Sequence, residues 1–256
     1  MGAKDSTLTR VVPLMEYLNK DISKINRLLQ LFEKKVSLNT EVIGYRYGKK
    51  SNGDPGEQSI PAKAELLEWY ILHPEKLDSS QNVQKNGSPS ISTIIARKEF
   101  FNGSKLRKEE ALSAIERIKT KRNYTYGKKW YYFEGYTNPD IYIETNSVIL
   151  IGEAKRTENH LTNEVLWYKN RDQLIRHVDS IFGTKRANNK KIYSFYILDE
   201  KNIGTLKDVK DYPKEKTLKD SLPHLTEEER LAIKNTYLGY TTWEKISSKF
   251  GIIFDT

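Results

Sequence analysis

The chain of 256 residues is long enough for one large domain with appendages. Lys and Arg number 43 against 34 Asp and Glu, a net charge of +9, and the absence of cysteine excludes disulfides, zinc fingers and cysteine nucleophiles. No run of 18 apolar residues and no signal-like N-terminus occur, so we expect a cytoplasmic protein that makes no contact with a membrane.

The first predicted element is a long helix from Pro13 to Lys35. Its apolar stripe is spaced by three and four residues and consists of Met15, Leu18, Ile22, Ile25, Leu29 and Phe32. The stripe fits either a dimer seam or one amphipathic helix packed on its own domain. We favour the second, because a lasting coiled coil needs about three or four heptads. A homodimer stays open.

Residues 44–59, GYRYGKKSNGDPGEQS, are predicted to form a loop, because Gly, Lys and turn-forming residues dominate there. A helix opened by Ser59 and Pro61 follows and ends near Pro74. The next segment is polar, and a second helix is predicted over residues 105–121.

Positive charge is concentrated between Arg97 and Lys129, where eleven basic residues accompany four acidic ones. Taken alone, such a run is more often a solvated helix face than a binding site. A protein that binds a polyanion nevertheless needs a localised positive field. The candidates for nucleic-acid contact are Lys105, Arg107, Lys108, Lys121 and Arg122.

From Trp130 onward the sequence becomes strand-like. The predicted strands are WYYFEGY, DIYIET, VILIGEA and KIYSFYIL, and the last two flank a predicted helix with the stripe Trp167, Leu174, Val178 and Ile181. A strand, helix, strand unit implies a crossover, so we predict an α/β fold with a mixed central sheet flanked by helices.

We predict three regions along the chain. Residues 1–60 are an N-terminal helix and loop, residues 61–200 are the core with a basic helical insertion at about 79–129, and residues 201–256 are a helical C-terminal extension. In this extension Thr226 and Glu229 match a capping box, and Gly239 separates two predicted short helices. The pair is more typical of a structural cap than of a helix-turn-helix DNA reader, since no basic recognition helix stands out.

Charged residues interrupt the two predicted strands of residues 138–158, NPDIYIETNSVILIGEAKRTE. If the chain folds back through a two-residue loop at positions 146–147, the residue numbers of any two cross-strand partners add up to 293. Asp140 then lies opposite Glu153, with Cβ atoms about 5 Å apart. Lys155 shares their face, because side chains alternate along a strand.

Two facing carboxylates destabilise a sheet unless a cation lies between them. Carboxylate oxygens without cysteine or clustered histidine suit Mg²⁺ or Mn²⁺. Such a metal lowers the pKa of its bound water and neutralises charge on a phosphoryl group, while Lys155 can orient that water or stabilise the transition state. The hairpin therefore predicts a metal site at Asp140 and Glu153 with Lys155 beside it.

The pair PD at residues 139–140 and EAK at residues 153–155 resembles the motif of the PD-(D/E)xK nuclease superfamily, which includes many restriction endonucleases and repair nucleases. The resemblance covers about residues 130–200 and implies the restriction-endonuclease-like αβββαβ core. It implies that Asp140 and Glu153 bind the metal and that Lys155 serves the nucleophilic water.

Members of the superfamily often add an acidic residue from the preceding helix, which Glu65 or Glu68 could supply here, and a polar residue on the following helix, which Gln173 could supply. Arg176 and His177 are able to share the face of Gln173. An ordinary histidine on the helix surface is an equally good interpretation of His177.

The resemblance implies a Mg²⁺- or Mn²⁺-dependent endonuclease that hydrolyses phosphodiester bonds, with double-stranded DNA as the expected partner and restriction, defence or repair as its setting. One alternative is an inactive nucleic-acid-binding module on the same fold, although the retained Asp, Glu and Lys argue against it. Another is an RNA-directed or nucleotide-activated nuclease, which would share the site and differ only in substrate.

Overall fold

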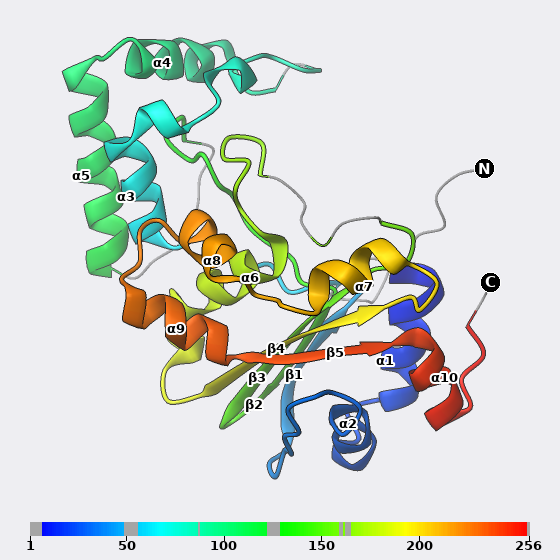
Figure 1. Ribbon diagram of the computed structural model, residues 1–256. Coiled ribbons are helices and arrows are strands. Elements are labelled where there is room, and N and C mark those ends of the chain that lie inside the picture. Colours follow the sequence, from blue (N-terminus) through cyan, green and yellow to red (C-terminus); the bar gives the residue numbers. More distant parts are fainter. Residues whose placement is uncertain are drawn as a thin grey trace.

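A five-stranded mixed β-sheet forms the centre of the protein (Figure 1). The computed structural model describes residues 7–48, 56–86, 88–121, 129–158, 161 and 165–254. The strands lie in the order of the chain and are β1 Val42–Tyr47, β2 Ile141–Thr145, β3 Val148–Ala154, β4 Lys191–Leu198 and β5 Tyr237–Thr242. The pairs β1–β2 and β2–β3 are antiparallel, and β3–β4 and β4–β5 are parallel. The predicted α/β fold with a mixed sheet is confirmed.

Helices lie on both faces of this sheet. The α-helices of the described residues are α1 Val12–Leu18, α2 Ile22–Leu29, α3 Ala64–Leu72, α4 Ile91–Phe101, α5 Lys105–Lys121, α6 Gln173–Phe182, α7 Ile203–Val209, α8 Glu215–Ser221, α9 Glu227–Asn235 and α10 Trp243–Phe250. Shorter turns of helix are η1 Thr7–Val11, η2 Pro74–Lys76, η3 Ser79–Gln81 and η4 Lys185–Ala187. Among the helices described, none is both long and apolar enough to cross a membrane.

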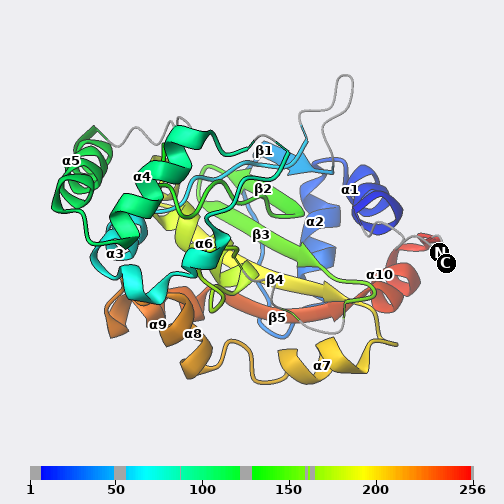
Figure 2. The same cartoon turned by 90° about the horizontal axis from the view of Figure 1, so that it is seen from above.

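The sheet separates two apolar cores. Residues of α1, α2 and α10 pack on one face, and residues of α6, α8 and α9 pack on the other. Figure 1 shows α2 below the sheet and α6 and α8 above it, and Figure 2 shows the strands from above with α7, α8 and α9 along the β5 side. Each face gains roughly 25 cal/mol per Å² of apolar surface removed from water.

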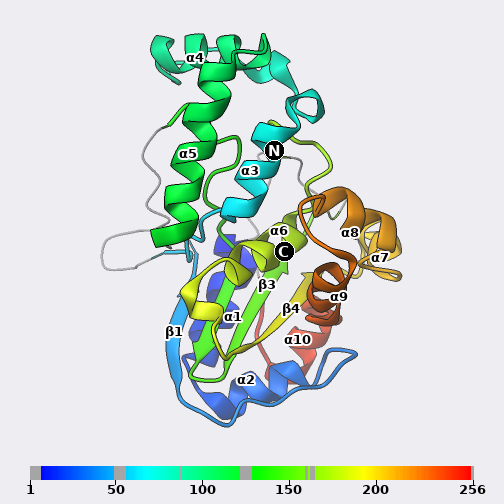
Figure 3. The ribbon, with the colours of Figure 1, turned by 90° about the vertical axis from the view of Figure 1, so that its left-hand side faces the viewer.

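A third core lies outside the sheet, in an arm built from α3, α4 and α5. These helices enclose Leu67, Phe100 and Ile115 together with aromatic residues of the segment 130–133. The arm projects away from the sheet in Figure 3. It contains the predicted basic insertion and also α3, so the arm is a packed helical unit with its own apolar interior.

Strand β3 is buried along its whole length, as its nearly continuous apolar sequence predicts. Close packing with β4 depends on Gly152, because a Cβ atom at this position would lie 2.4 Å from a ring carbon of Phe195. A side chain there would displace the Phe195 ring from the core beneath the end of β3, next to Glu153.

The predicted single helix over 13–35 is wrong. Asn19 and Lys20 adopt left-handed conformations, with φ of 42° and 61°, and divide the segment into α1 and α2. Asp21 then caps α2 by accepting hydrogen bonds from the main-chain N–H groups of Ser23 and Lys24. Most of the predicted stripe is buried in the core under the sheet.

Three other predicted elements are also wrong. Residues 44–47 of the predicted loop belong to β1, and residues 130–136 form no strand because Trp130 and Phe133 are buried against the helices of the arm. Gly239 lies in β5 instead of between two helices. Its φ of +100° brings the strand close to Glu33, a conformation that glycine adopts at little cost. The predicted capping box of Thr226 and Glu229 is present at α9.

Candidate active site

The hairpin of β2 and β3 has the predicted register. Ile141 pairs with Gly152 and Glu144 pairs with Ile149, which places positions 146–147 in the two-residue loop. Asp140, one residue before β2, therefore lies beside Glu153. Its Oδ2 accepts a hydrogen bond of 2.8 Å from the N–H of Ala154, so the end of β3 fixes the carboxyl group.

Lys155 and Gln173 join this acidic pair. The Lys155 Nζ lies 3.2 Å from Glu153 Oε1 and donates a hydrogen bond of 2.6 Å to Gln173 Oε1. Gln173 is the first residue of α6, and Asp172 caps that helix through the N–H of Ile175. The structure thus brings together the four residues predicted as catalytic, from β2, β3 and the N-terminus of α6.

The main chain of Lys155 is held from both sides of its strand. Its N–H donates to the carbonyl of Ile197 in β4, at 2.9 Å, and its carbonyl accepts from Trp243 Nε1 at the start of α10, at 3.2 Å. The side chain of Lys155 is also 3 % exposed and bonded to Gln173, so the ammonium group has little freedom to leave Glu153.

His177 completes the cluster and is not a surface residue. It is 2 % exposed, with Nε2 at 3.0 Å from Glu153 Oε2 and Nδ1 at 2.6 Å from Thr137 Oγ1. The sequence pattern predicted that His177 shares a helix face with Gln173 but assigned the histidine no role. No pattern indicated Thr137. The spacing of four residues from Gln173 was the only available signal for the histidine.

The carboxyl groups of the cluster are destabilised in their charged form. Burial and then the charge of Glu153 raise the pKa of Asp140 well above its ordinary value, and burial raises the pKa of Glu153 to about 6 despite the nearby Lys155. Burial lowers the pKa of His177 to about 3, so its imidazole is neutral near pH 7.

A divalent cation fits this donor set. A cation between Asp140 and Glu153 would offset the burial that raises both pKa values and the charge of Glu153 that further raises the pKa of Asp140. Across the described part of the chain, no group of three or more His, Asp or Glu side chains is arranged to hold a metal ion. Two carboxylates are nevertheless sufficient for Mg²⁺, which usually keeps several waters and adds substrate phosphate oxygens to one or two protein carboxylates.

The two glutamates predicted from α3 do not join the pair. Glu68 forms an ion pair with Lys119 of α5, with Oε2 at 2.6 Å from Nζ, so its carboxylate serves the arm. Glu65 has one buried oxygen, Oε2, without a hydrogen-bond partner among the described residues, and it forms no group with Asp140 and Glu153 that is arranged to hold a metal ion.

The basic residues predicted to contact nucleic acid differ in whether acidic residues of the protein already hold their charged groups. Lys105 is exposed at the start of α5 and Lys108 is half-buried. The guanidinium of Arg107 is held by Glu99 and Glu110, at 2.7 and 2.8 Å. The side chain of Lys121 and the whole of Arg122 lie outside the described residues. Lys105 and Lys108, two of the five predicted contacts, form no ion pair with another described residue.

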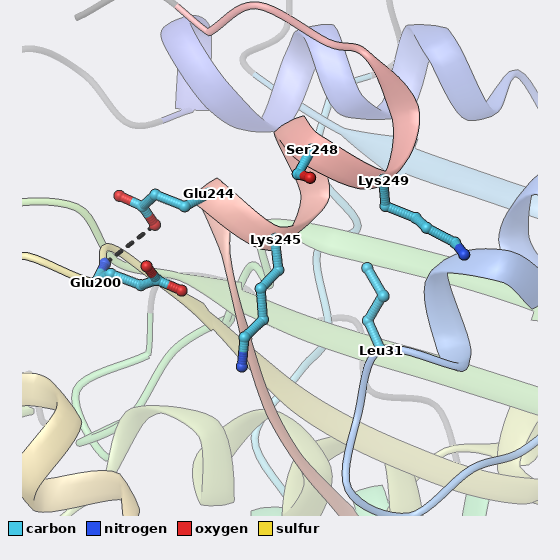
Figure 4. A pocket seen from close by; sticks show the side chains of 6 residues that line it. All are labelled: Leu31, Glu200, Glu244, Lys245, Ser248 and Lys249. Carbon is cyan, nitrogen blue, oxygen red and sulfur yellow. Dashed lines mark hydrogen bonds between the residues drawn. The ribbon is translucent and has the colours of Figure 1, made fainter.

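An open hollow of about 490 Å³ lies between α10 and the end of α2, on the opposite face of the sheet from the cluster. Figure 4 shows Glu200 and Glu244 at one end and Leu31 with Lys249 at the other. Glu244 accepts a hydrogen bond from the Glu200 N–H. The two carboxylates and Lys249 lie at opposite ends of the hollow, so they do not point to one place where a substrate could react. The buried cluster at Glu153 is therefore the stronger candidate.

No protein-family model matches the chain, and no curated protein or solved structure matches it either. The functional assignment therefore depends on the geometry and the electrostatics of the cluster.

Proposed function

We propose that the protein is a Mg²⁺- or Mn²⁺-dependent nuclease with a restriction-endonuclease-like core, acting on phosphodiester bonds of DNA as an endonuclease. The observation that carries the proposal is the juxtaposition of Asp140, Glu153 and Lys155 at the ends of β2 and β3, with Gln173 on Lys155. The PD and EAK residues occupy these positions, which supports a PD-(D/E)xK type of site.

The raised pKa values of the two carboxyl groups support a role in cation binding. A structural pair would be expected to have enough positive charge nearby to keep its pKa values at or below the ordinary range, whereas the ammonium of Lys155 leaves the pKa of Glu153 at about 6. Asp140 and Glu153 would hold the metal, which supplies a hydroxide-like water and neutralises phosphoryl charge when bound.

Lys155 is the group assigned to the attacking water. Its ammonium lies 3.2 Å from Glu153 Oε1, so it would be next to the metal and the phosphate together. Gln173 Oε1 accepts a hydrogen bond from one of the three N–H groups of this ammonium and so fixes the direction of the Lys155 side chain. A positioned cation at this place stabilises negative charge that develops on the phosphate in the transition state.

The decisive test is a cleavage assay with plasmid DNA, linear duplex DNA and RNA, in Mg²⁺, in Mn²⁺ and in chelator, for the wild type and Asp140→Asn. We expect metal-dependent nicking of DNA and a rate at least about 100-fold lower in the variant. Glu68→Gln is the matched control, because its carboxylate pairs with Lys119 in the arm.

Two results would contradict the proposal in different ways. Cleavage by Asp140→Asn at the wild-type rate would remove the site from the reaction. Failure of the folded wild type to cleave any of the three substrates, combined with retained DNA binding, would favour a nucleic-acid-binding module. Preference for RNA over DNA would keep the site and change the substrate.

A further inference from the structure

We propose that Thr137 and His177 are positioning residues that act in series, Thr137 on His177 and His177 on Glu153, to orient the Glu153 carboxylate for metal binding. Neither residue would touch the metal or the substrate. The inference rests on the proposed function, because it assumes that Glu153 is a metal ligand.

The donors and acceptors of this chain have one consistent assignment. An ionised Glu153 can only accept, so the His177 Nε2 at 3.0 Å must carry the proton that it donates. A neutral imidazole then has an acceptor at Nδ1, and the Thr137 hydroxyl at 2.6 Å must donate to it. The hydroxyl of Thr137 therefore selects the histidine tautomer that donates to Glu153.

Each member of the chain is held in place by the fold. Thr137 is 2 % exposed, and its main-chain N–H and carbonyl bond to Ile60 at 2.8 and 2.9 Å in an isolated antiparallel bridge. His177 is buried within α6. The hydroxyl and the imidazole thus approach from two independent elements, neither of which is the strand that carries Glu153.

The effect on Glu153 is to fix the plane of its carboxylate. Lys155 lies 3.2 Å from Oε1, and His177 lies 3.0 Å from Oε2. Each carboxylate oxygen has two lone pairs, so these contacts leave room for a metal. Without the donor on Oε2, the carboxylate would be free to turn toward Lys155 and away from the cation.

The test compares substitutions that keep or remove one hydrogen bond, read out as Mn²⁺ affinity by electron paramagnetic resonance and as the cleavage rate. Thr137→Val removes the hydroxyl at nearly constant volume, and Thr137→Ser keeps it. His177→Leu removes the donor to Glu153, and His177→Gln retains an amide N–H that can replace it. Outer-shell substitutions of this kind weaken metal binding by roughly 10- to 100-fold.

We expect Thr137→Val and His177→Leu to weaken Mn²⁺ binding by at least about tenfold, and Thr137→Ser and His177→Gln to restore most of it. In the His177→Leu background Thr137→Val should have no additional effect, because it acts through the imidazole. Thermal unfolding of each variant separates these losses from misfolding.

Three results are distinguishable. If the wild type binds Mn²⁺ and both Thr137→Val and His177→Leu bind it equally well, the inference is overturned while the proposed function stands. If Thr137→Val weakens binding by the same factor with and without His177, the series arrangement is wrong. If the folded wild type binds no Mn²⁺ and cleaves nothing, it is the proposed function that fails.

Discussion

Two buried charged clusters lie beside α6 and differ in how their charges are compensated. In the first, the metal-site cluster, Asp140 and Glu153 share Lys155 as their nearby cation. In the second, the balanced cluster, the Arg171 guanidinium bonds Glu134 at 3.0 Å and Asp179 at 2.6 Å. Glu153, Lys155 and the three residues of the balanced cluster are at most 2 % exposed, whereas Asp140 is partly exposed.

The pKa shifts of the two clusters have opposite directions. Burial acts to raise the pKa of Asp179, but His224 and then Arg171 outweigh it and hold this pKa below its ordinary value. At Glu153 burial outweighs Lys155 and raises the pKa to about 6. Burial alone therefore does not identify a functional carboxylate, whereas burial without sufficient positive charge from the protein indicates a carboxylate that is suited to bind a cation.

The largest effect is expected when the balanced cluster loses its cation. Arg171→Met should lower the free energy of unfolding by about 3–5 kcal/mol, because it leaves the buried carboxylates of Glu134 and Asp179 without their guanidinium. Urea unfolding followed by circular dichroism measures this loss.

Arg176→Met is the matched control for Arg171→Met. Arg176 lies 3.5 Å from the same Glu134 but its side chain is 21 % exposed, so we expect a loss of at most about 1 kcal/mol. Equal losses in the two variants would mean that Arg171 does not compensate the buried carboxylates in the way that the comparison requires.

The next effect concerns the cation that we propose binds the metal-site cluster. Mg²⁺ at about 100 times its dissociation constant should stabilise the folded protein by about 2.7 kcal/mol, which corresponds to a rise in Tm of roughly 5–10 °C for a chain of this size. The gain arises because the ion binds the paired carboxylates only in the folded state. Differential scanning calorimetry with and without chelator measures it.

Asp140→Asn should abolish this rise in Tm, and Glu68→Gln should keep it, since Glu68 is paired with Lys119. A rise of the same size in all three proteins would assign the metal effect to another place in the chain. Binding should also release protons, because the ion competes with the proton that the acidic pair holds.

The site was more predictable from the sequence than the surrounding fold. The alternating residues of the hairpin and its two-residue loop determine the register, and the register places Asp140 beside Glu153. The helix after β3 begins at Gln173. Its apolar stripe fixes which face of α6 turns to the sheet, and this determines where Gln173 lies. These features depend on short-range patterns within one hairpin and one helix.

Long-range packing was not predictable in the same way. β1 pairs with β2 across about a hundred residues, and it runs directly into residues 48–59, which are rich in Gly and Lys like a loop. The aromatic residues from Trp130 to Phe133 suit a strand equally well but are buried in the arm. Thr137 contacts His177 from a segment that is bridged to Ile60, and no local pattern indicates either contact.

A smaller expected effect is the pH dependence of stability that Glu153 causes. The pKa of Glu153 is about 6 in the folded chain against an ordinary 4.5, so the folded state keeps a proton that the unfolded state releases. The contribution of Glu153 to stability is therefore fully present below pH 4.5 and falls by about 2 kcal/mol in total as the pH rises to well above 6. Metal-free Glu153→Gln should gain this amount relative to wild type over the same range.

The difference between the two proteins is the quantity to measure, because His177, with its pKa lowered to about 3, contributes in the opposite direction in both. Urea unfolding at several pH values in chelator gives the difference. A difference that is independent of pH would show that Glu153 is not destabilised by burial, and the comparison with Asp179 would then lose its basis.

The smallest effect tests whether α5 touches nucleic acid. Lys105→Ala and Lys108→Ala should each lower the salt dependence of DNA binding by about one unit of slope, because each removes one phosphate contact. Lys245→Ala and Lys249→Ala beside the hollow of α10 are the controls and should leave the slope unchanged. Arg107→Ala should also leave the slope unchanged, since Glu99 and Glu110 already hold its guanidinium.

The two pairs of lysine variants distinguish two explanations of DNA binding. If the α5 pair and the α10 pair lower the slope equally, diffuse positive charge attracts the DNA. If only the α5 pair lowers it, the arm is part of the substrate-binding surface.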